Sequence, residues 1–122
     1  MTDAGGGAAR EANTDLAALP PELARQSLSD VTLILPLDGA IQAITLLTER
    51  GRRLEQWEGW VRLRDGTRAK SLTHGGSFAL SRDPARAAEA ASAAMKKASV
   101  YWDRNPEYPG AALYFGLTFG AR

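Results

Sequence analysis

The sequence predicts an α+β protein in which two helices pack on one face of a four-stranded antiparallel sheet. Short apolar or alternating segments, typical of strands, surround two segments with helical periodicity. Asp-Gly and Pro-Gly pairs mark turns at several boundaries between these segments. The 122 residues are 44% hydrophobic and 24% charged, which suits one domain with a single core.

The N-terminal part of the chain is expected to contribute little to that core. Residues 1–19 are small and polar, with three consecutive glycines, and cannot bury enough apolar surface to offset the entropy of ordering. We therefore expect a flexible tail there. Pro20 and Pro21 suit the first turn of a helix, so a short helix is expected over residues 20–28. The α+β domain is then expected to span residues 29–122.

The first strand is clear, but the segment after it has two interpretations. Residues 31–37 (VTLILPL) are almost wholly apolar, which predicts a central buried strand. The Asp38-Gly39 pair could open a hairpin and make residues 40–47 a second strand. Helical spacing is seen instead in the apolar residues Ala40, Ile41, Ala43, Ile44 and Leu47. Asp38 also suits an N-cap and Gly51 the residue after a helix, so we favour the helix.

A β-hairpin is expected next. Residues 54–64 alternate in polarity, and residues 67–73 provide a returning strand. The Asp65-Gly66 pair between them is typical of a two-residue type I′ turn. The Gly75-Gly76 pair indicates a bulge or bend before the strand resumes at residues 77–81.

The second helix has the clearest signals in the chain. Asp83 can cap it, Pro84 suits its first position, and residues 85–102 are rich in alanine. One stripe at helical spacing contains Ala87, Ala88, Ala91, Ala94, Met95, Ala98 and Trp102. Because most of these side chains are small, the helix can approach a sheet closely.

The last strand is expected over residues 111–119, where two alternating sets of side chains would occupy opposite faces. The larger set is Leu113, Phe115, Leu117 and Phe119, and the other is Ala112, Tyr114, Gly116 and Thr118. The resulting order of elements is that of the ferredoxin-like βαββαβ sandwich. If residues 31–47 form a hairpin instead, the fold becomes an antiparallel β-meander with one long helix.

The RNA-recognition-motif family shares the βαββαβ order. Its base-stacking motif would fall on residues 74–81 (HGGSFALS). Gly75 and Phe78 fit the motif, but Gly76 and Ser81 stand where the family has aromatic residues. Bases need aromatic side chains to stack on, and the first strand has none either. The chain therefore resembles this family in element order and, with a weak motif, over about twenty residues, and RNA binding of the family's kind is not favoured.

A group of basic and aromatic residues is the best candidate for a binding surface. The expected hairpin carries Arg53, Trp57, Trp60, Arg62, Arg64, Arg68 and Lys70. Arginine with tryptophan is typical of protein–protein hot spots, and equally of phosphate contact with base stacking. Acidic residues interleaved with the group partly neutralise it, which also allows an ordinary solvated face. Tyr114 and Thr118 would lie on or near the sheet face that the helices leave open.

His74 is the only histidine and the only classical acid–base side chain near the glycine pair. One enzyme hypothesis uses His74 as a base, with Arg62 or Lys70 to hold an anion. The sequence has no cysteine, no paired-histidine metal motif, no P-loop and no Gly-x-Ser-x-Gly elbow. We therefore expect neither a metal nor a cofactor.

The charge balance and composition complete the functional expectation. Fifteen basic and fourteen acidic residues give a net charge of +1, which disfavours a dedicated nucleic-acid binder. No apolar run approaches the roughly 20 residues that span a bilayer, and the start does not resemble a secretory signal. The sequence thus predicts a cytoplasmic, non-catalytic binding module. Its expected partner is a protein, including a second copy in a homodimer, with nucleic acid binding and a His74-based enzyme as alternatives.

Overall fold

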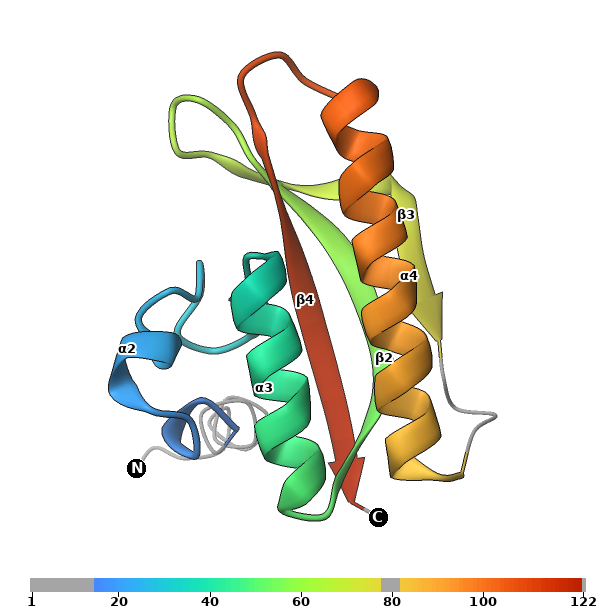
Figure 1. Cartoon of the computed structure of the whole chain (residues 1–122). Helices are drawn as coiled ribbons and strands as arrows, with labels where there is room; N and C mark the ends of the chain where they lie inside the picture. The colour runs from blue at the N-terminus through green and yellow to red at the C-terminus, as the bar shows by residue number, and fades with distance from the viewer. Residues whose placement is uncertain (1–14, 78–81, 122) are drawn as a thin grey trace.

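The computed structural model describes residues 15–77 and 82–121 and shows an α+β fold (Figure 1). The helices and strands, in chain order, are α2 Pro21–Ala24, β1 Leu33–Leu35, α3 Leu37–Glu49, β2 Arg52–Arg62, β3 Arg68–Ser77, α4 Pro84–Arg104 and β4 Ala112–Ala121. In this part of the chain, no helix is long and apolar enough to cross a membrane.

The strands form one open sheet in the order β1-β4-β2-β3, and every neighbouring pair is antiparallel. Helices α3 and α4 lie side by side on one face of this sheet (Figure 1). β4 and β2 occupy the centre, whereas the first and third strands do so in a ferredoxin-like sandwich. The ferredoxin-like arrangement is therefore not confirmed. The meander alternative does not occur either, because α3 is a helix.

Helix α3 confirms the helical interpretation of residues 39–51 but begins earlier than expected. Pro36 is its N-cap residue, with extended backbone angles, and Asp38 lies inside the first turn instead of capping it. Gly51 follows the helix with a φ of 84°, a left-handed conformation that glycine adopts without steric cost. Ala40, Ala43, Ile44 and Leu47 are buried, as the helical spacing predicts.

Strand β1 is a short edge strand, so the expectation of a central strand over residues 31–37 is wrong. Leu33, Ile34 and Leu35 are all buried. Their burial does not come from a central position in the sheet. It comes from the preceding segment, which covers the outer edge of β1. Ser27 Oγ accepts a hydrogen bond from the Ile34 N–H at 3.1 Å, and the Leu28 N–H donates to the Ile34 carbonyl at 2.9 Å. A continuous apolar run can thus be buried at a sheet edge.

The β2–β3 hairpin has a three-residue loop instead of the expected two-residue type I′ turn. The Leu63 N–H donates to the Thr67 carbonyl at 2.7 Å, and the Gly66 N–H donates to the Leu63 carbonyl at 2.8 Å. Gly66 has a φ of 91°. This combination is typical of a turn followed by a bulged glycine. The Asp65 carboxylate accepts the Thr67 N–H at 2.9 Å, which stabilises the longer loop.

Helix α4 confirms the predicted cap and buried stripe. The Asp83 side chain accepts a hydrogen bond from the Ala85 N–H at 3.0 Å, and Pro84 is the first helical residue. The buried residues are Ala87, Ala91, Met95, Ala98 and Trp102. They cover β2 and β4, whose inward side chains include Leu54, Trp57, Phe115, Leu117 and Phe119. Small side chains on the helix leave room for these large ones from the sheet.

The N-terminal segment joins the core earlier than the expected boundary at residue 29. Residues 1–14 lie outside the described part of the chain, but Leu19 and Leu23 are buried in the core. The Arg52 side chain lies 3.0 Å from the Asp15 carboxylate, and Arg50 donates a hydrogen bond to the Ala18 carbonyl. The helix expected over residues 20–28 is limited to α2.

Candidate functional site

Alternation along β2 divides the predicted binding residues between the two faces of the sheet. Trp57, Gly59 and Val61 are buried on the side of the helices, and the residues between them face the opposite, open side. Trp60 pairs with Tyr114 on β4 and with Lys70 on β3, while Arg62 pairs with Arg68. We call Trp60, Arg62, Arg68, Lys70 and Tyr114 the aromatic–basic cluster. All five were predicted from the sequence, and the sheet brings them together.

The two aromatic rings of the cluster are held against the sheet. A Cβ atom at Gly116 would lie 2.8 Å from Trp60 Nε1 and 2.9 Å from its Cδ1, so the indole occupies the space above this glycine. The Arg62 guanidinium lies over the Tyr114 ring, with its carbon 5.6 Å from the ring centroid. Both aromatic residues are only partly buried. The cluster therefore presents pre-positioned aromatic and guanidinium surfaces.

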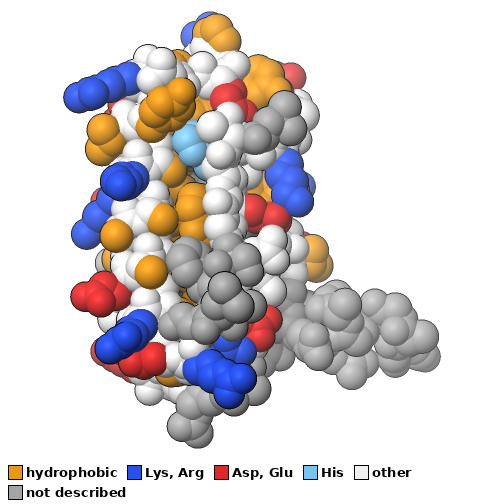
Figure 2. All heavy atoms as spheres, turned by 90° about the vertical axis from the view of Figure 1, so that its right-hand side faces the viewer, with side chains coloured by type: hydrophobic (Ala, Val, Ile, Leu, Met, Phe, Trp, Pro, Cys, Tyr) orange, Lys and Arg blue, Asp and Glu red, His pale blue; other side chains and the backbone are white. Residues whose placement is uncertain are grey.

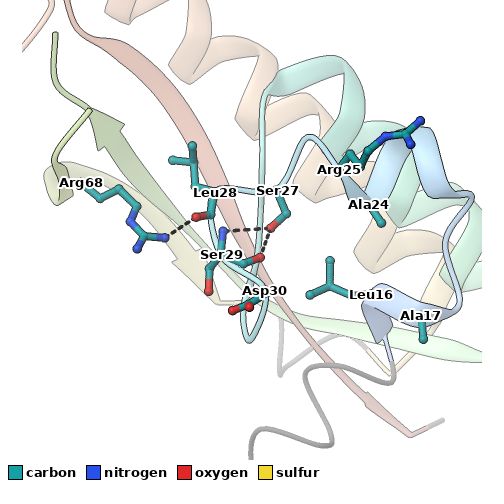
Figure 3. A pocket seen from close by; sticks show the side chains of 9 residues that line it. All are labelled: Leu16, Ala17, Ala24, Arg25, Ser27, Leu28, Ser29, Asp30 and Arg68. Carbon is teal, nitrogen blue, oxygen red and sulfur yellow. Dashed lines mark hydrogen bonds between the residues drawn. The ribbon is translucent and has the colours of Figure 1, made fainter. Parts of the chain in front are cut away.

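The cations of the cluster have different surroundings. The Lys70 ammonium lies 3.1 Å from a carboxylate oxygen of Glu58, an exposed pair that contributes little to stability. Arg68 donates a hydrogen bond to the Leu28 carbonyl. Since the N–H of Leu28 is bonded to Ile34 in β1, this one residue links the two edge strands. The turn at residues 27–30 therefore crosses part of the open face (Figure 3).

A pocket of about 710 Å³ lies between this turn and the N-terminal segment (Figure 3). Its lining combines apolar side chains with two arginines and one aspartate: Leu16, Ala17, Ala24, Arg25, Ser27, Leu28, Ser29, Asp30 and Arg68. The serine hydroxyls already bond to the turn's own backbone, Ser27 to Ser29 and Ser29 to Val31 and Thr32. The pocket thus borders the aromatic–basic cluster through Arg68, without converging polar groups of its own.

The remaining predicted residues lie elsewhere. The Trp57 ring is 4% exposed and packs against Phe115 in the core, with the ring centroids 5.7 Å apart. Arg53 lies toward the other end of β2 and pairs with Glu55 at 3.5 Å. Arg64 follows the end of β2 and lies against Gly110. The predicted arginine and tryptophan residues therefore do not form one continuous surface.

His74 lies on the helix side of the sheet, inside an irregular stretch of β3. Trp60 pairs with Lys70 and Glu58 with Gly75, so residues 71–74 lie opposite the single residue Gly59. Ser71 Oγ accepts hydrogen bonds from the N–H groups of residues 73 and 74 at 3.2 Å and donates to Glu107 at 2.6 Å. These bonds fix a bulge that turns the His74 ring toward helix α4.

The geometry around His74 bears on the enzyme hypothesis. Its ring meets Tyr101 of α4 edge-on, with centroids 5.8 Å apart. Its Nε2 atom is buried and has no hydrogen-bond partner in the described part of the chain. Lys70 and Arg62 face the opposite side of the sheet. The enzyme hypothesis requires Arg62 or Lys70 beside His74, and the structure places neither cation there.

Sequence reasoning missed three of these features: Tyr101 beside His74, the Ser71–Glu107 bond and the Leu28–Arg68 bond. Tyr101 lies just off the buried stripe of α4, which marks it as exposed but not as a neighbour of β3. The two bonds join residues 36 and 40 positions apart, so no local pattern indicates them. Among the described residues, no three metal-ligating side chains gather in one place.

No family model, curated protein or solved structure matches this chain.

Proposed function

We propose that this protein is a non-catalytic binding module that recognises another protein through the aromatic–basic cluster. One observation carries the proposal: on an open sheet face, Trp60 pairs with Tyr114, and Arg62 stacks over that tyrosine. Trp, Tyr and Arg are the residue types most enriched at the hot spots of protein interfaces. Their positions are held by the sheet, so little side-chain entropy is lost on binding.

The charge arrangement favours a protein over a nucleic acid. Lys70 already pairs with Glu58, and Arg68 donates to the chain's own Leu28 carbonyl. Glu58 would also repel phosphates beside the aromatic rings. The small, exposed side chain of Thr118 on the same face allows another surface to approach closely. A second copy of the chain is one such partner, and the cytoplasmic location expected from the sequence is part of the same proposal.

A site-specific photo-crosslinker tests the proposal in the source cells. We would place it at Thr118, which is exposed on the open face, and as a matched control at Glu89, which is exposed on α4. The expected result is a discrete protein product, including a crosslinked dimer, from position 118 only, which survives nuclease treatment. It should fall roughly tenfold or more in Trp60→Ala, as for a hot-spot residue.

Two outcomes would refute the protein-binding proposal. One is that positions 118 and 89 capture the same proteins, which means that no particular face is recognised. The other is that the product at position 118 disappears on nuclease treatment or is unchanged in Trp60→Ala.

Nucleic-acid binding is a second candidate because Arg62, Arg68 and Lys70 surround Trp60 and Tyr114. Such a face can bind single strands by stacking and phosphate contact. Fluorescence anisotropy with labelled single-stranded oligonucleotides at two salt concentrations tests it. Binding that weakens steeply with salt and is lost in Trp60→Ala would support this candidate over protein recognition.

A further inference from the structure

The two edges of the sheet differ in what covers them. At the β1 edge, Ser27 and Leu28 bond to the backbone of Ile34. At the other edge, β3 pairs with β2 on one side, and no described segment pairs with its outer side. An uncovered edge presents backbone N–H and C=O groups to which another extended chain can add as a strand. The backbone N–H and C=O groups on the outer side of β3 therefore suit a peptide in extended conformation as the binding partner.

The β3 edge also adjoins a hollow in the surface (Figure 2). Figure 2 looks onto this edge and shows the only histidine of the sequence, in pale blue, recessed beside hydrophobic side chains. His74 reaches this position because Ser71 fixes the bulge of residues 71–74. Bulges that redirect a side chain are common next to binding and active sites. Tyr101, which is 52% exposed, forms the wall of the hollow on α4.

The charges around the edge select the occupant. β3 carries no acidic residue, and its basic residues are Arg68, Lys70 and His74. Lys70 pairs with Glu58 and Arg68 donates to the Leu28 carbonyl, so the exposed cations of α4 matter most. On α4, Lys97 and Arg104 lie four residues before and three residues after Tyr101, so all three share one side of the helix, and both cations are exposed. Glu107, the acid that contacts the bulge, accepts a hydrogen bond from Ser71. The surroundings of the hollow are therefore mainly basic.

The same charges disfavour pairing with the β3 strand of a second copy. Basic side chains are a feature with which natural edge strands discourage self-pairing, because two copies of the strand would place like charges together. An acidic strand, in contrast, would gain favourable contacts with Lys97 and Arg104, the exposed cations of α4 beside the hollow. We propose that β3, with His74, Tyr101 and Lys97, binds an extended acidic peptide segment of a partner protein as an added strand. This surface shares Arg68 and Lys70 with the aromatic–basic cluster, but it is the edge of β3 and not the open face, and it does not depend on the cluster's function.

Selection of random peptides displayed on phage, with the whole protein as the target, tests the proposal. Enriched sequences should be rich in Asp and Glu and should alternate these with apolar residues. A synthetic peptide of the enriched sequence should bind Lys97→Glu roughly fivefold or more weakly than Lys96→Glu. Lys96 is the matched control because it carries the same charge but lies about 140° around the helix from Tyr101.

The location of binding separates this proposal from the proposed function. In NMR spectra, the peptide should shift the backbone amides of β3 and the ring signals of Tyr101, and Trp60→Ala should leave its affinity unchanged. Failure to enrich peptides, enrichment without acidic residues, equal affinity for the two lysine variants, or shifts confined to β1 or the open face would each overturn it. None of these results affects the crosslinking test at Thr118.

Discussion

Two adjacent glycines in β3 should respond in opposite ways to the same substitution. A Cβ atom at Gly76 would lie 2.8 Å from Trp57 Nε1 and 3.3 Å from its Cε2. The Trp57 ring is 4% exposed and packs against Phe115, so it cannot move aside freely. At Gly75, the nearest atom to a new Cβ is the Trp57 carbonyl oxygen at 3.6 Å, which is an ordinary contact.

We expect Gly76→Ala to lower the free energy of unfolding by about 2 kcal/mol, because overpacking a core typically costs roughly 1–3 kcal/mol. Gly75→Ala should be neutral or stabilise by up to about 1 kcal/mol, since alanine reduces the entropy of the unfolded chain without a clash. Urea unfolding followed by far-ultraviolet circular dichroism measures both values. In thermal unfolding, the Gly76 variant should melt roughly 8 °C below the wild type.

A double-mutant cycle shows whether Trp57 causes the difference. Phenylalanine at position 57 lacks the indole nitrogen that the new methyl group would meet. In the Trp57→Phe background, Gly76→Ala should therefore cost about 1 kcal/mol less than in the wild type. Two results would refute the packing of the Trp57 indole against Gly76. One is that the Gly75 and Gly76 substitutions have equal effects. The other is that the cost of Gly76→Ala is the same with Trp57 and with Phe at position 57.

Three further substitutions or titrations test local features of the fold. Ser71→Ala should destabilise the protein by roughly 1–3 kcal/mol in urea unfolding, because the bulge amides lose their acceptor and Glu107 loses a donor. Ser71→Thr keeps the hydroxyl and should retain most of this stability. An unchanged unfolding midpoint for the alanine variant would contradict the bulge geometry. Asp83→Ala removes the cap of α4 and should cost about 1 kcal/mol in thermal unfolding, whereas Asp83→Asn should cost less. The hydrogen bond from the Thr67 backbone lowers the pKa of Asp65 below 3.8, so the carboxylate's contribution to stability is present above the unfolded-state pKa and disappears as the pH falls through the folded-state pKa. An NMR titration should show this lowered pKa, and a normal value would contradict the loop geometry.

The sequence was sufficient for elements that local chemistry determines. Helix α4 has a side-chain cap, a proline at its first position and a stripe of small apolar residues, and each signal acts within a few residues. The order of strands in the sheet depends instead on which strands pair across the whole chain. The apolar run at residues 31–37 indicated burial correctly. It could not reveal that Ser27 and Leu28 would cover an edge strand.

The candidate surface was also predictable only in part, because local alternation along a strand can be derived from the sequence but long-range contacts cannot. Alternation along a strand places residues that differ by an odd number on opposite faces, so the three-residue spacing of Trp57 and Trp60 already separates them. The two tryptophans therefore belong to different surfaces, and only Trp60 is available to a partner on the open face. Tyr114 was assigned correctly to the open face because β4 alternates without interruption. The position of His74 could not be derived, because the bulge that redirects it depends on the Ser71 side chain.

Three arginines in or beside the β2–β3 hairpin have structural contacts with the N-terminal segment. Arg50 donates to the Ala18 carbonyl, Arg52 pairs with Asp15, and Arg68 donates to the Leu28 carbonyl. These partners are 32, 37 and 40 residues away along the chain, so composition alone could not assign them. Removal of residues 15–30 would take these partners away from all three guanidinium groups and uncover core side chains at once, although Arg52 also donates to the Phe119 carbonyl. A truncated chain would therefore be less stable and present a more basic surface, and only the full chain can show which arginines remain for a partner.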